Sequence, residues 1–98
     1  MKQTEKFILI KGLFSAEDAT EVLLSLINYK IRFHQMKNFS LQERFGKNDK
    51  YSLERIDELK VSRERIETII GEAKSGNADM IINSSIDISI KTLPKAKH

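Results

Sequence analysis

Hydrophobic residues recur with two different periods along this chain, and the change of period marks its elements. Over residues 80–91 the period is two. The positions that share one face there are Met80, Ile82, Ser84, Ile86, Ile88 and Ile90. This alternation predicts a half-buried strand. Residues 7–10, extended by Lys11 and stopped by Gly12, are rich in aromatic and β-branched side chains and predict a first strand with both faces apolar.

Between the two strands the period becomes helical. Ser15 is a favourable N-cap, and Glu17 and Asp18 place negative charge in the first turn, where the helix dipole favours it. The helix that follows carries two apolar seams, each alternating steps of three and four residues. The first seam consists of Ala19, Val22, Leu26, Tyr29, Phe33 and Met36, and the second seam consists of Leu24, Ile27, Ile31 and His34.

Two seams are more apolar surface than a chain of this size is expected to cover. At about 100° per residue they lie well over 90° apart on the helix. One further helix and two short strands offer little material to bury both. We therefore expect the second seam, Leu24, Ile27, Ile31 and His34, to form the interface of a homodimer. Edge-to-edge pairing of the strands is the alternative contact.

A second helix is predicted from Ser52, or from Asp49 as the alternative cap, to about Lys74, with a stop at Gly76 and Asn77. Its apolar stripe consists of Ile56, Leu59, Ile66, Ile70 and Ala73. The path predicts one α+β domain over residues 1–98, a β-α-α-β fold in which a long antiparallel helical hairpin packs on a two-stranded antiparallel sheet. We expect order over about residues 5–91 and a basic tail over residues 92–98.

Residues 38–52 are predicted to form the turn of the hairpin. Ser40 and Glu43 have the capping-box spacing, which predicts a separate helical turn over residues 41–45 that ends at Gly46. The tip is both apolar and basic. Its candidate partner-binding residues are Phe39, Arg44, Phe45, Lys47 and Lys50. The apolar side chains at this tip, which include Leu41, must pack on the helix ends, on one another or on a second chain.

The stretch FHQMKNFSLQERFGKNDKYSLERIDEL, residues 33–59, resembles a group of small uncharacterised bacterial proteins with a similar hairpin turn. The resemblance covers the whole chain loosely and the turn more closely. It implies no activity, no cofactor and no catalytic residue.

The charge distribution adds an alternative partner. The chain has 17 lysine and arginine residues against 14 aspartate and glutamate residues, a net charge of +3. Residues 30–50 alone have a charge balance of +4, from six basic and two acidic residues, and such a patch can attract nucleic acid or another acidic partner. The sequence contains no recognised DNA- or RNA-binding motif. Nucleic-acid binding through the basic tip is therefore the alternative and not the favoured hypothesis.

Candidate chemistry is sparse. The absence of cysteine excludes disulfides, thiolate metal sites and cysteine nucleophiles. The two histidines, His34 and His98, lack the spacing of metal ligands, so we expect His34 to be hydrogen-bonded to a neighbouring polar group at the interface. Two copies of His34 brought together in a symmetric dimer would make association pH-sensitive. No phosphate-binding glycine loop or nucleophile elbow is present, and we expect no enzymatic activity, cofactor or metal.

No apolar run is long enough to span a bilayer and no secretion signal is apparent, so we expect a cytoplasmic protein. These features together predict a non-enzymatic homo-oligomeric interaction or scaffold domain. Its partner, beyond a second copy of the chain, is an unidentified protein.

Overall fold

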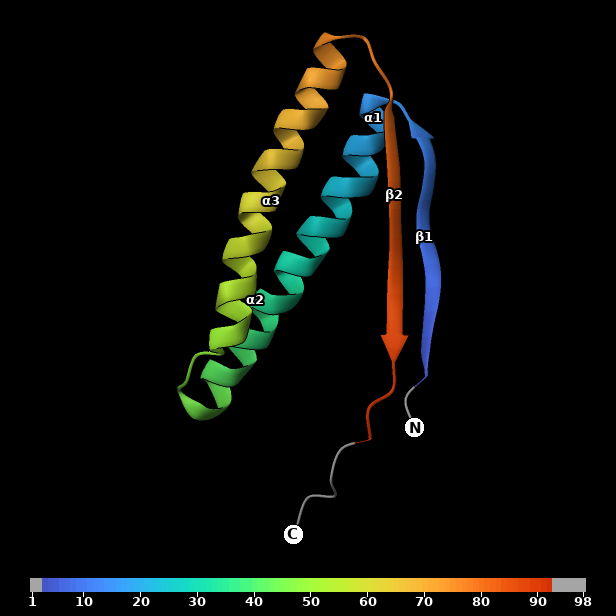
Figure 1. Ribbon diagram of the computed structural model, residues 1–98. Coiled ribbons are helices and arrows are strands. Elements are labelled where there is room, and N and C mark those ends of the chain that lie inside the picture. Colours follow the sequence, from blue (N-terminus) through green and yellow to red (C-terminus); the bar gives the residue numbers. More distant parts are fainter. Residues whose placement is uncertain (1–2, 93–98) are drawn as a thin grey trace. The chain divides into compact units, whose positions relative to one another are not determined.

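The computed structural model describes residues 3–92, which form six elements (Figure 1). In chain order they are β1 (Thr4–Phe14), α1 (Ala16–Ala19), the π-helical turn η1 (Thr20–Leu24), α2 (Ser25–Phe45), α3 (Lys50–Ser75) and β2 (Met80–Ser89). Because α1, η1 and α2 are successive parts of one helix, the predicted α+β class and the order strand, helix, helix, strand are confirmed. The predicted basic tail lies outside the described residues from residue 93 onward.

The chain divides into two compact units, one containing the two strands and one containing the helical hairpin. In the first unit β1 and β2 pair as the predicted antiparallel sheet (Figure 1). The hydroxyl oxygens of Thr4 and Ser89 lie 2.5 Å apart, which joins the start of β1 to the end of β2.

β1 is longer than predicted at both ends, because it begins at Thr4 and not at Phe7, and it does not stop at Gly12 but continues to Phe14. Gly12 has a φ of +140°. Glycine adopts this conformation without the clash that a Cβ would cause, so the strand passes through a residue that was expected to end it.

The sheet unit leaves most of its large apolar side chains exposed. Among its residues within 3–92, only Ile10 and Ile82 of the large apolar ones are buried. The predicted half-buried pattern of β2 therefore holds from Met80 to Ser84 but fails beyond it, where Ile86 and Ile88 are exposed. Each strand also has a neighbour on one side only, so both keep an unpaired edge within the described part of the chain.

In the second unit the first helix begins where its cap predicts. The backbone N–H of Asp18 donates a 3.1 Å hydrogen bond to Ser15 Oγ, which satisfies a donor that the first helical turn leaves without an intrahelical partner. The Thr20 hydroxyl donates to the carbonyl oxygen of Ala16, 2.8 Å away, at the point where the regular helix widens into the π turn. A hydroxyl bonded to the carbonyl four residues earlier is one of the contacts that perturb a regular helix.

α2 runs unbroken through Ser40, so the separate helical turn predicted over residues 41–45 is wrong. Those residues are helical, but they continue α2, in which each N–H already finds a carbonyl and no new cap is needed. The helix ends at Gly46 as predicted. The Gly46 backbone has a φ of +64°, and its N–H donates to the carbonyl of Gln42 at 2.8 Å.

α3 begins at the alternative cap. Asp49 Oδ1 accepts a 3.2 Å hydrogen bond from the backbone N–H of Ser52. The helix ends at Ser75, and Asn77 adopts the left-handed conformation that the predicted stop requires.

α2 and α3 lie side by side and antiparallel (Figure 1). Their core consists of Ile31, Ile56 and Leu59, with Ile27 packed against it. Farther along the hairpin, Arg63 Nη1 on α3 donates a 2.6 Å hydrogen bond to Asn28 Oδ1 on α2. The two helices are thus joined by apolar packing and by a polar contact. The packing of this hairpin on the sheet stays a prediction.

Candidate functional site

The second seam, which was predicted as the homodimer interface, lies on the inner side of the hairpin. Ile31 and His34 are each only 5% exposed, and Leu24 and Ile27 are half-buried. Ile31 and Ile27 belong to the core that α2 shares with α3. This seam therefore packs against α3 of the same chain, and a contact with a second chain has to be sought on another surface.

His34 belongs to a buried polar chain that links the two helices near the turn. Its Nδ1 lies 3.2 Å from the hydroxyl oxygen of Ser52, which is fully buried. The Ser52 hydroxyl in turn donates to Asp49 Oδ2 at 3.2 Å. Because a serine hydroxyl carries a single proton, this arrangement assigns the Nδ1 hydrogen to His34, which donates to Ser52. The prediction that His34 is hydrogen-bonded to a polar neighbour is confirmed, although its neighbour belongs to the same chain.

The surroundings of His34 favour the neutral imidazole. Burial lowers its pKa below the usual 6.5, and the positive charges of Lys30, Arg55 and Lys37 lower it further, while Asp49 acts in the opposite sense. The ring also makes edge contacts with its aromatic neighbours, at centroid distances of 5.2 Å to Phe33 and 6.0 Å to Tyr51. This histidine is therefore a packed structural element of the hairpin.

Further side-chain bonds hold the turn between α2 and α3. The Asp49 backbone N–H donates to Asn38 Oδ1 at 2.6 Å, and Gln42 Nε2 donates to Asn48 Oδ1 at 2.7 Å. These bonds hold the short loop onto the last turns of α2. The tip of the hairpin is consequently built by polar contacts and not by its aromatic residues.

The first seam divides at the π turn. Ala19 is fully buried, whereas the members from Leu26 onward are exposed. In a regular helix these positions would share one face. A π turn contains about one residue more than an α-turn, so it rotates everything before it by about 100° relative to the rest. Ala19 is thereby moved to a buried position, and the remainder of the seam stays outside.

Four large apolar residues of this seam remain on the outside of α2. Leu26, Tyr29, Phe33 and Met36 are 38%, 66%, 48% and 59% exposed, respectively. We call these four the exposed seam. Their spacing of three and four residues aligns them along nearly three turns of one helix face. At the middle, Lys30 Nζ lies 5.8 Å from the centre of the Phe33 ring.

The corresponding face of α3 is different in character. Four large apolar residues are exposed on α3, namely Tyr51, Leu53, Val61 and Ile69, but their spacing does not align them on one face, and the positions around Val61 are charged, among them Glu54, Glu58 and Arg65. Arg55 and Glu58 form an ion pair on this helix. Two helices of similar length thus share a core, but only α2 keeps an apolar stripe on its outside. Such a stripe marks an interaction surface more often than an ordinary solvated face.

The predicted partner-binding residues at the tip are all exposed. Phe39 and Phe45 have more than half of their surface accessible, and Leu41 alone is half-buried. The favoured interpretation, in which the apolar residues of the tip form a local core, is therefore wrong for both phenylalanines. Arg44, Lys47 and Lys50 are exposed beside them and leave the tip basic.

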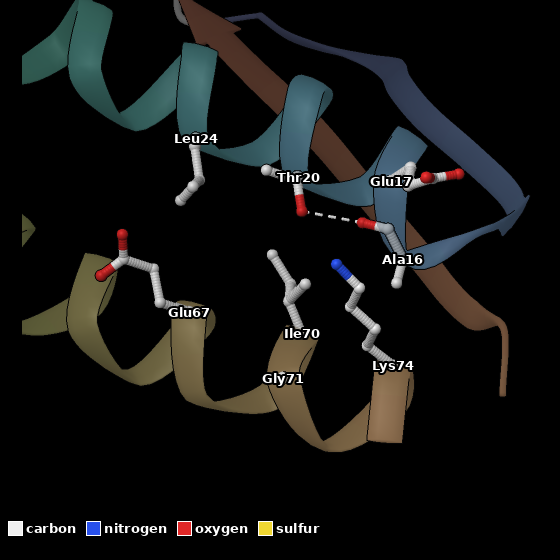
Figure 2. Close-up of a pocket in the computed structure, with 8 residues that line it drawn as sticks. All are labelled: Ala16, Glu17, Thr20, Leu24, Glu67, Ile70, Gly71 and Lys74. Atoms are coloured by element: carbon white, nitrogen blue, oxygen red, sulfur yellow. Dashed lines mark hydrogen bonds between the residues drawn. The ribbon is translucent and has the colours of Figure 1, made fainter. Parts of the chain in front are cut away.

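A pocket of about 250 Å³ opens where η1 and the first turn of the helix face the end of α3 (Figure 2). Leu24 and Ile70 point into the space between the two helices, and Glu67 and Lys74 flank it. Its one hydroxyl, on Thr20, is engaged by the carbonyl oxygen of Ala16. The residues that line this pocket provide no pairing of a nucleophile with a base.

Residues 3–92 contain no group of three or more histidine and carboxylate side chains placed to hold a metal ion. No helix among these residues combines the length and the apolar character needed to cross a membrane. Comparison with models of known protein families, with curated proteins and with solved structures finds no match.

Proposed function

We propose that this protein is a non-enzymatic interaction domain that acts as a homo-oligomer, in the simplest case a homodimer, and serves as a scaffold for an unidentified protein partner. The observation that carries the proposal is the exposed seam. Four large apolar side chains aligned on one helix face are costly to leave in water, and burying them against another surface removes that cost.

A second copy of the chain suits this seam well. Two helical hairpins that join their apolar faces form a four-helix arrangement, in which α2 of each copy becomes a central helix. A two-fold contact covers the seam of both copies at once, because each copy offers the same patch to the other.

The expected strength of this contact follows from the area concerned. Eight apolar side chains, each about half exposed, correspond to about 6–12 kcal/mol of hydrophobic stabilisation. Association itself costs about 4–15 kcal/mol in lost translational and rotational freedom. We therefore expect a reversible, concentration-dependent dimer and not a permanently joined one.

The test is the molar mass in solution across a concentration series, measured by sedimentation equilibrium or light scattering. Phe33→Glu places a charge in the middle of the exposed seam and is expected to give a monomer that stays folded by circular dichroism. Val61→Glu is the matched control, because it introduces the same charge at an exposed apolar position of α3. It is expected to associate like the wild type. Equal behaviour of the two variants would contradict the proposed contact.

The strands provide the alternative contact between copies. Among the described residues both strands keep an unpaired edge, and Ile86 and Ile88 are exposed on β2. Edge-to-edge pairing in a dimer would make a four-stranded sheet. The double variant Ile86→Lys/Ile88→Lys distinguishes the two contacts. Loss of the dimer in this variant, together with its retention in Phe33→Glu, would assign the contact to the sheet.

A second candidate function is the binding of nucleic acid or another acidic partner by the tip. The observation that favours it is the exposure of Phe45 beside Arg44, Lys47 and Lys50, since a base can stack on an aromatic ring while basic side chains contact phosphates. A gel-shift assay at low salt tests it, with Lys47→Glu/Lys50→Glu as the comparison. Binding that the variant abolishes would support this function, and the absence of any shift with the wild type would eliminate it.

A further inference from the structure

The exposed seam is symmetric about the position of Ile31. Tyr29 and Phe33 lie two residues on either side of that position, and Leu26 and Met36 lie five residues on either side. When two copies of such a helix pack antiparallel, each residue faces the one at the same distance beyond the centre. In an antiparallel pair, each large apolar residue of the exposed seam therefore lies opposite a large apolar residue of the partner's exposed seam.

The charges along the same helix have opposite signs in its two halves. Residues 15–29 contain three acidic residues, Glu17, Asp18 and Glu21, and no basic one. Residues 30–45 contain four basic residues and one acidic residue, and the basic ones are Lys30, Arg32, Lys37 and Arg44. All seven of the charged side chains named here are exposed.

The helix dipole accounts for only part of this distribution. It favours acidic residues in the first turn and basic residues in the last turn, and its effect decays within a turn of each end. Glu17 and Asp18 lie in the first turn and Arg44 in the last. Lys30, Arg32 and Lys37 lie two or more turns from the end of α2, where the dipole gives no reason for a cluster of positive charge.

We propose that two copies of this chain join their exposed seams antiparallel about a two-fold axis at the level of Ile31, so that the acidic half of each helix faces the basic half of the other. This inference rests on the proposed function, which it extends by fixing the direction and register of the contact. Tyr29 then faces the partner's Phe33, and Leu26 faces the partner's Met36, while the acidic residues before the π turn lie at the level of the partner's Arg44 at the end of its helix. A parallel pair would place acidic residues against acidic and basic against basic, which opposes association.

A distance measurement reads out the direction. Ser40 is exposed and continues the spacing of the exposed seam beyond Met36. The chain contains no cysteine, so Ser40→Cys carries a spin label at a unique position. With a rise of 1.5 Å per residue, two labelled positions lie about 28 Å apart in the antiparallel pair and about 10 Å apart in a parallel one. The longer distance is the expected result.

A charge-reversal experiment tests the pairing of the two halves. Glu17→Lys/Glu21→Lys makes the acidic half basic, and Lys37→Glu/Arg44→Glu makes the basic half acidic. Each double variant alone is expected to dimerise about tenfold more weakly than the wild type, and an equimolar mixture is expected to regain the lost affinity as a heterodimer. A mixture that associates no better than either variant would overturn the charge pairing.

The outcomes of these experiments distinguish a wrong antiparallel register from a wrong proposal of dimerisation. A wild-type dimer that Phe33→Glu dissociates, but in which the labelled Ser40 positions lie about 10 Å apart, would overturn the antiparallel register and leave the interaction domain standing. A wild-type protein that remains monomeric at every concentration would overturn both. As a control, Ser40→Cys combined with Phe33→Glu is expected to give no intermolecular distance.

Discussion

His34 on α2 and Ser52 on α3 are joined by a 3.2 Å hydrogen bond in the interior of the hairpin, and the Ser52 hydroxyl donates a second hydrogen bond to Asp49 Oδ2. Three residues from both sides of the turn thus form one polar chain beside the apolar core of Ile31, Ile56 and Leu59. His34 needs the Ser52 hydroxyl as its acceptor, and this hydroxyl needs the Asp49 carboxylate as its acceptor. Because the alternative to each bond is an unsatisfied buried group, the chain specifies how the two helices meet.

Removal of the central hydroxyl is expected to destabilise the hairpin. Ser52→Ala leaves the Nδ1–H of His34 without its acceptor and should lower the free energy of unfolding by about 1–3 kcal/mol. Urea unfolding, followed by circular dichroism at a fixed protein concentration, measures the change. Ser62→Ala is the matched control, since Ser62 is exposed on the same helix, and a change within about 0.5 kcal/mol is expected there. Equal losses in the two variants would contradict the role given to the buried chain.

The stability of the protein is expected to depend on pH through His34. Its pKa in the folded state is lowered, chiefly by burial, below the value of 6.5 that it has in an unfolded chain. The unfolded state therefore binds a proton at a higher pH than the folded state does. Stability is then fully present above about pH 6.5 and is lost as the pH falls through the folded pKa.

Urea titrations between pH 5 and pH 8 test this dependence, with His34→Gln as the comparison, because glutamine keeps a donor but does not titrate in this range. The wild type should lose stability on the acidic side of this range, and the variant should lose less. Parallel pH profiles for the two proteins would show that His34 is not the responsible group.

Two glycines are expected to respond to alanine with opposite signs. Gly46 ends α2 with a φ of +64°, and an L-residue in that conformation costs about 1–2 kcal/mol. Gly71 is helical, and a Cβ added there would meet nothing within 4 Å, so alanine should stabilise α3 by about 0.5–1 kcal/mol. Thermal unfolding of Gly46→Ala and Gly71→Ala measures both changes. The same sign for both would contradict the assignment of Gly46 as the cap.

Substitutions in the two seams of the first helix are expected to have different effects, on stability for the second seam and on dimerisation for the exposed seam. Ile31→Ala opens a cavity in the core of the hairpin and should cost about 2–4 kcal/mol of stability. Phe33→Ala, only two residues away, removes an exposed side chain and should mainly weaken dimerisation. Unfolding at low protein concentration reports the first effect, and sedimentation reports the second. A large loss of monomer stability from Phe33→Ala would place that residue in the core.

The sequence predicts the elements of this fold well because each rests on a local signal. Ser15 and Asp49 act as helix caps, Gly46 and Asn77 mark helix ends, and the twofold alternation from Met80 marks a strand. The turn predicted over residues 38–52 is shorter, because α2 continues to Phe45 and α3 begins at Lys50. The boundary errors at Gly12 and at Ser40 have one cause. Glycine is typical of strand ends and serine of helix starts, yet β1 continues through Gly12 and α2 continues through Ser40.

The candidate site was harder to predict, because the sequence shows two apolar seams without showing which one faces α3. The choice depends on tertiary packing and on the π turn, whose extra residue moves Ala19 away from the face of Leu26. The spacing of apolar residues is interpreted by assuming a regular α-helix, so it cannot predict a π turn. The second seam, with Ile31 and His34, therefore proved to be the inside of the hairpin.

The most direct test of the central claim is sedimentation equilibrium of the wild type beside Phe33→Glu at matched concentrations. We expect the wild-type mass to rise with concentration toward twice the 11.3 kDa of one chain, and the mass of the folded variant to stay at that of a single chain. A wild-type protein that sediments as a monomer at every concentration, or a Phe33→Glu variant that associates as strongly as the wild type, would contradict it.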